Sequence, residues 1–289
     1  MSRKILTILR NLYHIVVKRE IIIKPSRGIN WRALKEIKHY KDLLFFFIWK
    51  EFKVRYKQTL LGVAWAILRP VIQMLIFTLI FHKFAKIPSE GIPYPVYAYC
   101  GLLPWQLFSL GLGRASESVV GNASIITKVY FPRIILPLSY TLGGLIDFGL
   151  QFFVLIILML IFGIKIGLSI LFIPFFIILA LLSSLSVGIL FSALNVKFRD
   201  IRHLMPFLTQ VWFFATPIVY SHEIIPEKFR LIMRINPMTG VVEGFRWSLL
   251  NKGSVDFQAI LFSVIIVSFL IFAGLLYFSK VEREFADIV

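Results

Sequence analysis

The sequence predicts an all-α membrane protein with six transmembrane helices, and three observations support that fold class. Apolar residues make up 58% of the 289 residues, and the mean hydropathy is +0.82, whereas soluble domains are about 45–50% apolar. These apolar residues gather into six long stretches. The single cysteine, Cys100, excludes an intrachain disulfide framework and an all-cysteine metal site.

Each stretch is close to or longer than the ~20 residues that cross a bilayer core about 30 Å thick. The predicted spans are residues 60–82, 94–112, 134–162, 168–194, 204–220 and 257–278. An even number of spans places both termini on one side. Residues 1–59 hold 15 Lys and Arg against four acids, while the other connections divide their basic residues equally between the two sides. Because basic residues near span ends favour the cytoplasm, both termini are expected there.

We divide the chain into a basic cytoplasmic or interfacial region, 1–59, and a six-helix membrane domain, 60–289. The positive charge suits attraction to anionic lipid, and the region contains no nucleic-acid-binding motif. Apolar residues recur at helical spacing over 5–16, which is typical of a helix lying on a membrane surface. The apolar run 43–49 is too short to span and predicts another interfacial helix before the first span.

The connection between the last two spans predicts two short re-entrant, or else interfacial, helices over residues 226–250 on the outer side. Asn236-Pro237 breaks this segment into two pieces that are each shorter than a span. Glu243 and Arg246 stand three residues apart and are expected to pair. Non-helical backbone at membrane depth is tolerated only inside protein or beside an aqueous cavity, so this segment is expected to border a pathway.

Two charged residues lie inside predicted spans. Arg69 stands mid-span beside Pro70, which removes a backbone hydrogen bond and kinks a helix. A charge there costs at least ~2.5–3.5 kcal/mol, so Arg69 either faces a pathway or is held by a neighbouring helix. Asp147 is expected to serve helix packing, with Arg69 as a candidate partner. A single acid is not the relay that an ion-coupled transporter needs.

Two cytoplasmic connections, residues 122–132 and 195–203, mix apolar and polar residues. They could form helical turns across the membrane normal, and their composition is equally consistent with tight connectors. The chain shows neither G-x-x-x-x-G-K-[ST] nor G-x-G-x-x-G, and no metal-ligand cluster or hydrolase motif. We therefore expect no cofactor, no metal and no catalytic activity, with any uphill movement driven by a partner.

Four stretches carry a family resemblance. They are RYKQTLLGVAWAILRPVIQMLIF (55–77), KVYFPRIILPLS (128–139), NVKFRDIRHLMPFLTQVWFFATPIVY (195–220) and NPMTGVVEGFR (236–246). In this order the chain resembles the transmembrane permease subunit of polysaccharide ABC exporters, the Wzm type that exports O-antigen. The permeases for capsule and teichoic-acid export are close relatives of that type.

The resemblance implies a homodimer in the bacterial inner membrane, bound to two separate cytoplasmic ABC ATPase subunits. It implies that the two connections are coupling helices, that residues 226–250 form an outer gate, and that a basic stretch leads to a lateral gate for a lipid-linked substrate. The coupling residues so implied are Lys128, Val129, Tyr130, Phe198, Arg199 and Asp200. The gate residues are Asn236, Pro237, Glu243 and Arg246. The basic residues are Lys50, Lys53, Arg55 and Lys57.

The chemistry of the substrate favours two of these assignments. A polyprenyl diphosphate has an anionic head, to which Lys and Arg offer charge and hydrogen bonds, although a positive-inside anchor would use the same residues. Sugar rings have apolar faces that pack against aromatic rings. Candidates for lining a channel are Trp65, Arg69, Phe77, Tyr97, Tyr99, Trp105 and Trp212. Helical periodicity does not tell whether each ring faces a channel, lipid or the core.

The leading hypothesis is the channel-forming permease of an ATP-driven exporter of lipid-linked, O-antigen-type polysaccharide. Export of teichoic acid or capsular polysaccharide is the alternative within the same fold. A membrane enzyme acting on a polyprenyl substrate would need clustered acids or histidines, and the cytoplasmic loops offer only Asp200 and Glu117. A proton- or sodium-coupled transporter would need more acids within the spans.

Overall fold

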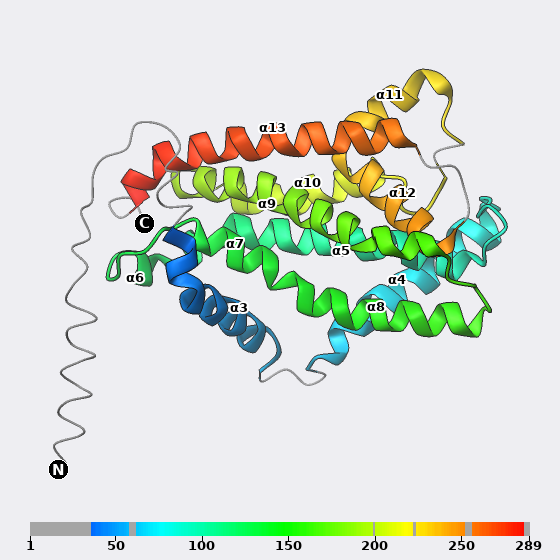
Figure 1. The fold of residues 1–289 in the computed structure, drawn as a ribbon, viewed down its shortest axis with the longest axis horizontal. Coiled ribbons are helices and arrows are strands. Elements are labelled where there is room, and N and C mark those ends of the chain that lie inside the picture. The colour runs from blue at the N-terminus through cyan, green and yellow to red at the C-terminus, as the bar shows by residue number, and fades with distance from the viewer. Residues whose placement is uncertain (1–35, 58–61, 199, 222–223, 252–255, 286–289) are drawn as a thin grey trace, which may run out of the picture.

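A computed structural model describes residues 36–57, 62–198, 200–221, 224–251 and 256–285. Every regular element in these ranges is a helix (Figure 1). The first half contains η1 (Ile37–Tyr40), α3 (Lys41–Tyr56), α4 (Ala64–Phe77), η2 (Thr78–Phe84), α5 (Tyr94–Glu117), η3 (Val120–Asn122), α6 (Ala123–Ile126), α7 (Ile135–Leu142) and α8 (Gly144–Ile161). The second half contains η4 (Leu168–Phe172), α9 (Ile173–Lys197), α10 (Ile201–Phe214), α11 (Glu227–Ile235), α12 (Pro237–Leu250), α13 (Phe257–Val281) and η6 (Glu282–Glu284).

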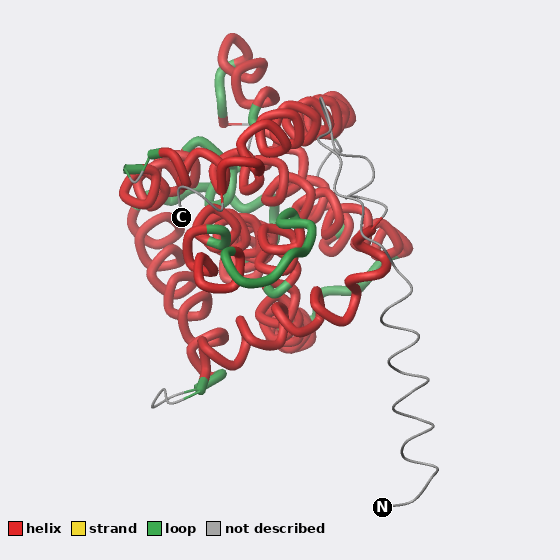
Figure 2. Tube along the Cα trace, turned by 90° about the vertical axis from the view of Figure 1, so that its left-hand side faces the viewer, coloured by secondary structure: helices red, strands yellow, loops and turns green. Residues whose placement is uncertain are grey.

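The long helices run side by side in one bundle, which Figure 2 shows from its end. α5 lies in the middle and packs against α9, α7, α8, α4 and α12, and α13 covers α9 and α12. The side chains of α5 are correspondingly buried along most of its length, among them Tyr97, Tyr99 and Phe108. The core of the bundle is therefore built around α5.

Four helical segments are long and apolar enough to cross a membrane, namely Ala64–Phe84, Ile135–Ile161, Leu168–Lys197 and Phe257–Glu284. They coincide with four of the six stretches predicted from the sequence. The other two stretches fall on α5, whose 24 residues include tyrosines, prolines and glycines, and on α10, which has only 14 residues. An all-helical, multi-pass membrane fold follows from these observations, while the six-span topology stays a prediction.

Small residues let α5 and α9 approach closely. A Cβ atom added at Gly188 would lie 2.6 Å from the Cβ of Ala115, and one added at Gly111 would lie 2.5 Å from the Ser184 hydroxyl. Membrane helices use such small residues because their association depends on close backbone packing rather than on exclusion of water. A larger side chain at either glycine would push the two central helices apart.

α3 is the helix predicted before the first span, and it extends beyond the expected run 43–49. It packs on α7, with Phe47 fully buried and 5.9 Å from Phe131 between ring centroids, while Phe45 and Trp49 are exposed. Its position in a membrane interface stays a prediction. The surface helix expected over 5–16 and the domain boundary at residue 59 lie outside the described residues.

The chain breaks between α11 and α12 at Asn236-Pro237, where the sequence predicts a break. Asn236 has extended backbone, and its side-chain oxygen accepts a hydrogen bond of 3.0 Å from the Met238 amide, which caps α12. α11 has no buried residue, whereas α12 is largely buried against α5, α9 and α13. Whether the two helices re-enter a membrane stays a prediction.

Candidate functional site

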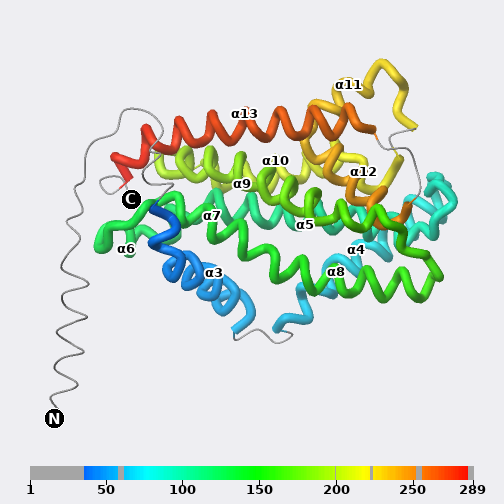
Figure 3. The backbone as a smooth tube through the Cα atoms, viewed as in Figure 1, coloured from blue at the N-terminus to red at the C-terminus, as the bar shows by residue number. Residues whose placement is uncertain are grey.

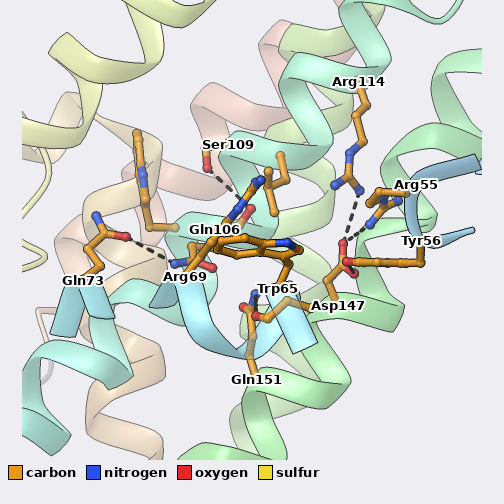
Figure 4. Close-up of a pocket in the computed structure, with 13 residues that line it drawn as sticks. Arg55, Tyr56, Trp65, Arg69, Gln73, Gln106, Ser109, Arg114, Asp147 and Gln151 are labelled. Carbon is orange, nitrogen blue, oxygen red and sulfur yellow. Dashed lines mark hydrogen bonds and ion pairs between the residues drawn. The ribbon is translucent and has the colours of Figure 1, made fainter. Parts of the chain in front are cut away.

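A pocket of about 380 Å³ lies between α3, α4, α5 and α8 (Figure 4). Two indoles and many polar groups line it. The lining comprises Arg55, Tyr56, Trp65, Ala66, Arg69, Gln73, Trp105, Gln106, Ser109, Leu110, Arg114, Asp147 and Gln151. Figure 4 shows the groups around Asp147 on one side and Gln73 on the other, with Trp65 between them.

Asp147 is the centre of a buried ionic cluster. It lies in the first turn of α8 and is only 2% exposed. Its carboxylate accepts hydrogen bonds from Arg55 and Tyr56 of α3 and, at 3.3 Å, from Arg114 of α5. The predicted pairing of Asp147 with Arg69 is therefore wrong, because Arg55 and Arg114 bind this carboxylate from two neighbouring helices. The expected role in helix packing fits the geometry, since Asp147 joins α3, α5 and α8.

Glu51 supplies a second carboxylate to the same two arginines. Its Oε1 lies 3.4 Å from Nη2 of Arg55 and 3.6 Å from Nε of Arg114. Two negative charges thus offset two positive charges in a largely buried place, which is the arrangement that makes buried ions tolerable. Partial burial, followed by the bond to Asp147, raises the pKa of the Tyr56 phenol above its usual value, because both favour the protonated form that donates to Asp147.

Arg69 lies outside this cluster. Its guanidinium sits 5.7 Å from the centre of the Trp65 ring, and it forms no ion pair or hydrogen bond with any residue that the structure describes. Pro70 next to it does not end α4, which continues to Phe77 and then into the π-helical η2. Arg69 is therefore the lining arginine whose charge the described carboxylates leave unpaired.

Amide side chains form the wall beyond Arg69. Nε2 of Gln106 donates to Oε1 of Gln73 at 3.4 Å, and Ser109 contacts the Gln106 carbonyl at 3.5 Å. Trp105 forms the adjoining wall and packs edge-on against Phe213 with centroids 5.6 Å apart. The pocket thus combines a guanidinium, flat apolar rings and amides that both donate and accept hydrogen bonds.

The four basic residues expected to guide a lipid head differ in their surroundings. Arg55 points to Asp147, and Lys50 donates to the Asn122 side chain at 2.9 Å. Lys53 sits 5.5 Å from the ring centre of Trp49, and Lys57 follows the last residue of α3; both are exposed. Only Lys53 and Lys57 thus present exposed charge, whereas Lys50 and Arg55 hold α3 in place.

The two connections lie at the same end of the bundle as the start of α3 (Figure 3). Lys128, Val129 and Tyr130 are all exposed there. Phe198, 57% exposed, and Asp200 follow the end of α9, while Arg199 lies outside the described residues. An ion pair of 3.5 Å between Arg202 and Glu117 and a bond from Asn195 to the Ser116 carbonyl tie the second connection to α5.

A family model for ABC-2 type transporters matches residues 42–250, which contain the pocket, both connections and α12. The chain belongs to the ABC-2 type transporter family. The O-antigen export system permease protein RfbA of Klebsiella pneumoniae is 32% identical over 249 residues, 86% of this chain and 95% of the relative. The protein of the same name from Myxococcus xanthus is 28% identical over 259 residues, 89% and 98% of the two chains.

A third relative of this ABC-2 chain is the polysialic acid transport protein KpsM of Escherichia coli. It is 25% identical over 202 residues, 67% of this chain and 76% of the relative. The resemblance to polysaccharide export permeases, drawn above from four stretches, is confirmed by these matches.

Of the seven channel candidates in this ABC-2 chain, Trp65, Arg69 and Trp105 line the pocket. Tyr97 and Tyr99 are fully buried between helices. Phe77 packs against Phe213 with centroids 5.7 Å apart, and Nε1 of Trp212 donates to Oδ1 of Asn236 at 2.7 Å.

Of the residues expected at an outer gate, Pro237 and Arg246 are buried, whereas Asn236 and Glu243 are half-buried. Arg246 donates to the Ile218 carbonyl at 2.7 Å and to the Tyr97 hydroxyl at 2.9 Å, while its pairing with Glu243 stays a prediction. Its guanidinium also lies 3.8 Å from the centre of the Tyr97 ring. Asn236 binds the Thr216 hydroxyl at 2.8 Å, and Pro237 begins α12. Both polar side chains therefore hold the end of α10 and the backbone after it against α12.

Sequence reasoning missed Arg114, Gln73, Gln106 and Gln151 as pocket residues. Each lies within a helix, and the periodicity of the sequence does not tell which neighbouring helix its side chain faces. The spacing of four between Glu51 and Arg55 was a usable signal for an ion pair. Within the described residues, no group of His, Cys, Asp and Glu could hold a metal ion.

Proposed function

We propose that this chain is the channel-forming permease subunit of an ATP-driven exporter, which moves an O-antigen-type polysaccharide linked to polyprenyl diphosphate across the bacterial inner membrane. The observation that carries the proposal is the 32% identity to an O-antigen export permease over 86% of the chain. The pocket supports it, because a cationic guanidinium beside indoles and amides suits a ligand that is both anionic and sugar-like.

We assign six spans to each subunit, with both termini cytoplasmic. α5 and α10 are the two additional spans beside the four apolar helical segments. At 1.5 Å per residue, the 24 residues of α5 extend about 36 Å, which exceeds a hydrocarbon core of ~30 Å. Its lower hydropathy suits its place inside the bundle, where it contacts protein. α10 needs the following residues to complete a crossing, and α11 and α12 would then be the re-entrant pair on the outer side.

The partners in this proposal are a second copy of the chain and two cytoplasmic ABC ATPase subunits. α4 and α10 leave apolar residues exposed, including Ile72, Ile76 and Phe207, which suits the placement of the second copy there. Lys128, Val129, Tyr130, Phe198, Arg199 and Asp200 are the docking residues for the ATPases. Membrane lipid covers the remaining apolar faces.

The lipid-linked end of the substrate approaches along α3. Lys53 and Lys57 offer exposed charge for its diphosphate at the cytoplasmic surface, and the pocket lies just beyond the end of α3. Export of capsular polysaccharide is the second candidate, favoured by the 25% identity to a polysialic acid transport protein. Teichoic-acid export is a further alternative that the same fold could serve.

Deletion of the gene in its own host tests the function. Loss of a polysaccharide attached to lipid A, restored by the wild-type gene, supports O-antigen export, whereas loss of a capsule favours the second candidate. An unchanged cell surface would contradict polysaccharide export.

Purification of the tagged chain from detergent-solubilised native membrane tests the partners. A stoichiometric ATPase subunit is expected, lost in the double variant R199A/D200A. The double variant E227A/R230A likewise removes one acidic and one basic residue, at the opposite end of the bundle, and should retain the ATPase. A lone chain without ATPase activity would contradict the exporter and favour a membrane enzyme or an ion-coupled transporter.

A further inference from the structure

The charges around the pocket are unequally available to a ligand. Arg55 and Arg114 are held by Asp147 and Glu51. If a ligand anion withdrew Arg55, Asp147 would lose one of its two guanidinium partners while remaining buried, which is unfavourable for a carboxylate. The described carboxylates leave only Arg69 among the lining arginines unpaired, so a bound anion would meet Arg69.

The groups around Arg69 are arranged on two facing helices. Trp65, Arg69 and Gln73 recur every four residues and share one face of α4, and all three line the pocket. Gln106 faces them from α5 and binds Gln73 at 3.4 Å (Figure 4). An anion held by Arg69 would therefore have an indole one turn before it and a pair of amides one turn after it.

We propose that Trp65, Arg69, Gln73 and Gln106 form a binding subsite for an oxyanion that adjoins a sugar ring. The planar guanidinium binds the oxyanion through two parallel hydrogen bonds. The indole covers the apolar face of the sugar, and the amides pair with its hydroxyls, since each amide both donates and accepts. The volume of about 380 Å³ falls within the usual range of ligand pockets, ~300–1,000 Å³.

Two substrate parts carry this chemistry: the diphosphate that joins the first sugar to the lipid, and the carboxylate of an acidic sugar within the polymer. The inference rests on the proposed function, and it adds the residues that read the charge and the adjoining sugar. It also separates Arg69 from Arg55, Lys50 and the ionic cluster, whose contacts are structural.

Binding of defined probes to the purified full-length chain in nanodiscs tests the subsite. The probes are citronellyl diphospho-N-acetylglucosamine, N-acetylneuraminic acid and uncharged N-acetylglucosamine, and the readout is tryptophan fluorescence. R69Q should weaken binding of at least one charged probe about tenfold or more, and R69K should weaken it less. Binding of the uncharged sugar should be the same in R69Q and wild type.

The variants Q73L and Q106L extend the test to the amides. Their results can be interpreted even if R69Q does not fold. Each should weaken both the charged probe and the uncharged sugar. K83Q, in η2 beyond the pocket, removes a charge near the other end of the same helical segment and should bind like wild type. Thermal unfolding of every variant checks that the fold is retained.

The charged probe that responds to R69Q identifies the source of the oxyanion. The inference is overturned if R69Q binds both charged probes as wild type does, or if K83Q loses as much binding as R69Q. It is also overturned if Q73L and Q106L leave both kinds of probe unaffected. The proposed function is tested separately, by restoration of surface polysaccharide with the wild-type gene, so either idea can fail while the other stands.

Discussion

The Gln151 side chain donates a hydrogen bond of 3.2 Å to the carbonyl of Ala66, the acceptor that Pro70 leaves without a helical donor. In an unbroken helix that carbonyl would accept from the amide of residue 70, which proline lacks. Inside a membrane protein a neighbouring side chain must meet such a freed group. α8 thus completes the hydrogen bonding of α4 at the turn that precedes Arg69.

Replacement of Gln151 by Leu should lower the free energy of unfolding by about 1–3 kcal/mol, because the buried Ala66 carbonyl loses its donor. The measurement is reversible unfolding in mixed micelles by titration with denaturing detergent. Q258L, at an exposed position of α13, is the matched control and should change little. In a P70A background the backbone donor returns, so Q151L should then cost less; an equal cost in both backgrounds would rule out this explanation.

Removal of the Asp147 charge in D147N should cost up to about 3–5 kcal/mol, because Arg55 and Arg114 lose a shared buried carboxylate. The exposed pair between Glu117 and Arg202 provides the comparison, and E117Q should cost only ~0–1 kcal/mol. The same unfolding titration measures both. Equal losses would show that the cluster contributes no more than a surface ion pair.

Replacement of Gly244 by Ala should lower stability by about 1–3 kcal/mol through overpacking, because the new methyl would lie 2.0 Å from the Phe176 ring. G149A is the control, since a Cβ there meets nothing within 4 Å. The Phe176→Leu change should recover part of the loss when it is combined with G244A. This account of α12 packing would be contradicted if G149A lowered the free energy of unfolding as much as G244A, or more.

Tyr56 should ionise at higher pH than an ordinary tyrosine, because partial burial and the bond to Asp147 raise its pKa. The unfolded chain releases this proton near pH 10, before the folded chain does. Its contribution to stability is therefore complete below about pH 10 and is lost as the pH rises through the folded-state pKa. The near-ultraviolet difference between wild type and Y56F checks this, and a transition at or below pH 10 would contradict it.

The helices of the fold were largely predictable from the sequence. Long apolar runs predicted α4, α8, α9 and α13, because a helix that crosses a bilayer must be long enough to span it and apolar enough to lie in its hydrocarbon core. The Asn236-Pro237 dipeptide marked the start of α12 because proline fits the first turn of a helix.

The pairing of helices was not predictable from one sequence. Asp147 could be assigned to a guanidinium but not to the correct one, since spacing along the chain does not tell which helix lies beside α8. Tyr99 and Trp105 are both aromatic residues with one polar group on α5, and both are buried, yet only Trp105 lines the pocket. Only the packing of α5 separates them.

Two of the side-chain contacts of α3 reach different parts of the protein, because Lys50 binds Asn122 and Arg55 binds Asp147. Asn122 begins the first connection, whereas Asp147 belongs to the pocket wall, and five residues of rigid helix, about 7.5 Å of rise, separate the two attachments. Through these two contacts, α3 joins the first connection to the wall of the pocket. If an ATPase docks at that connection as proposed, α3 links the docking site to the wall of the pocket.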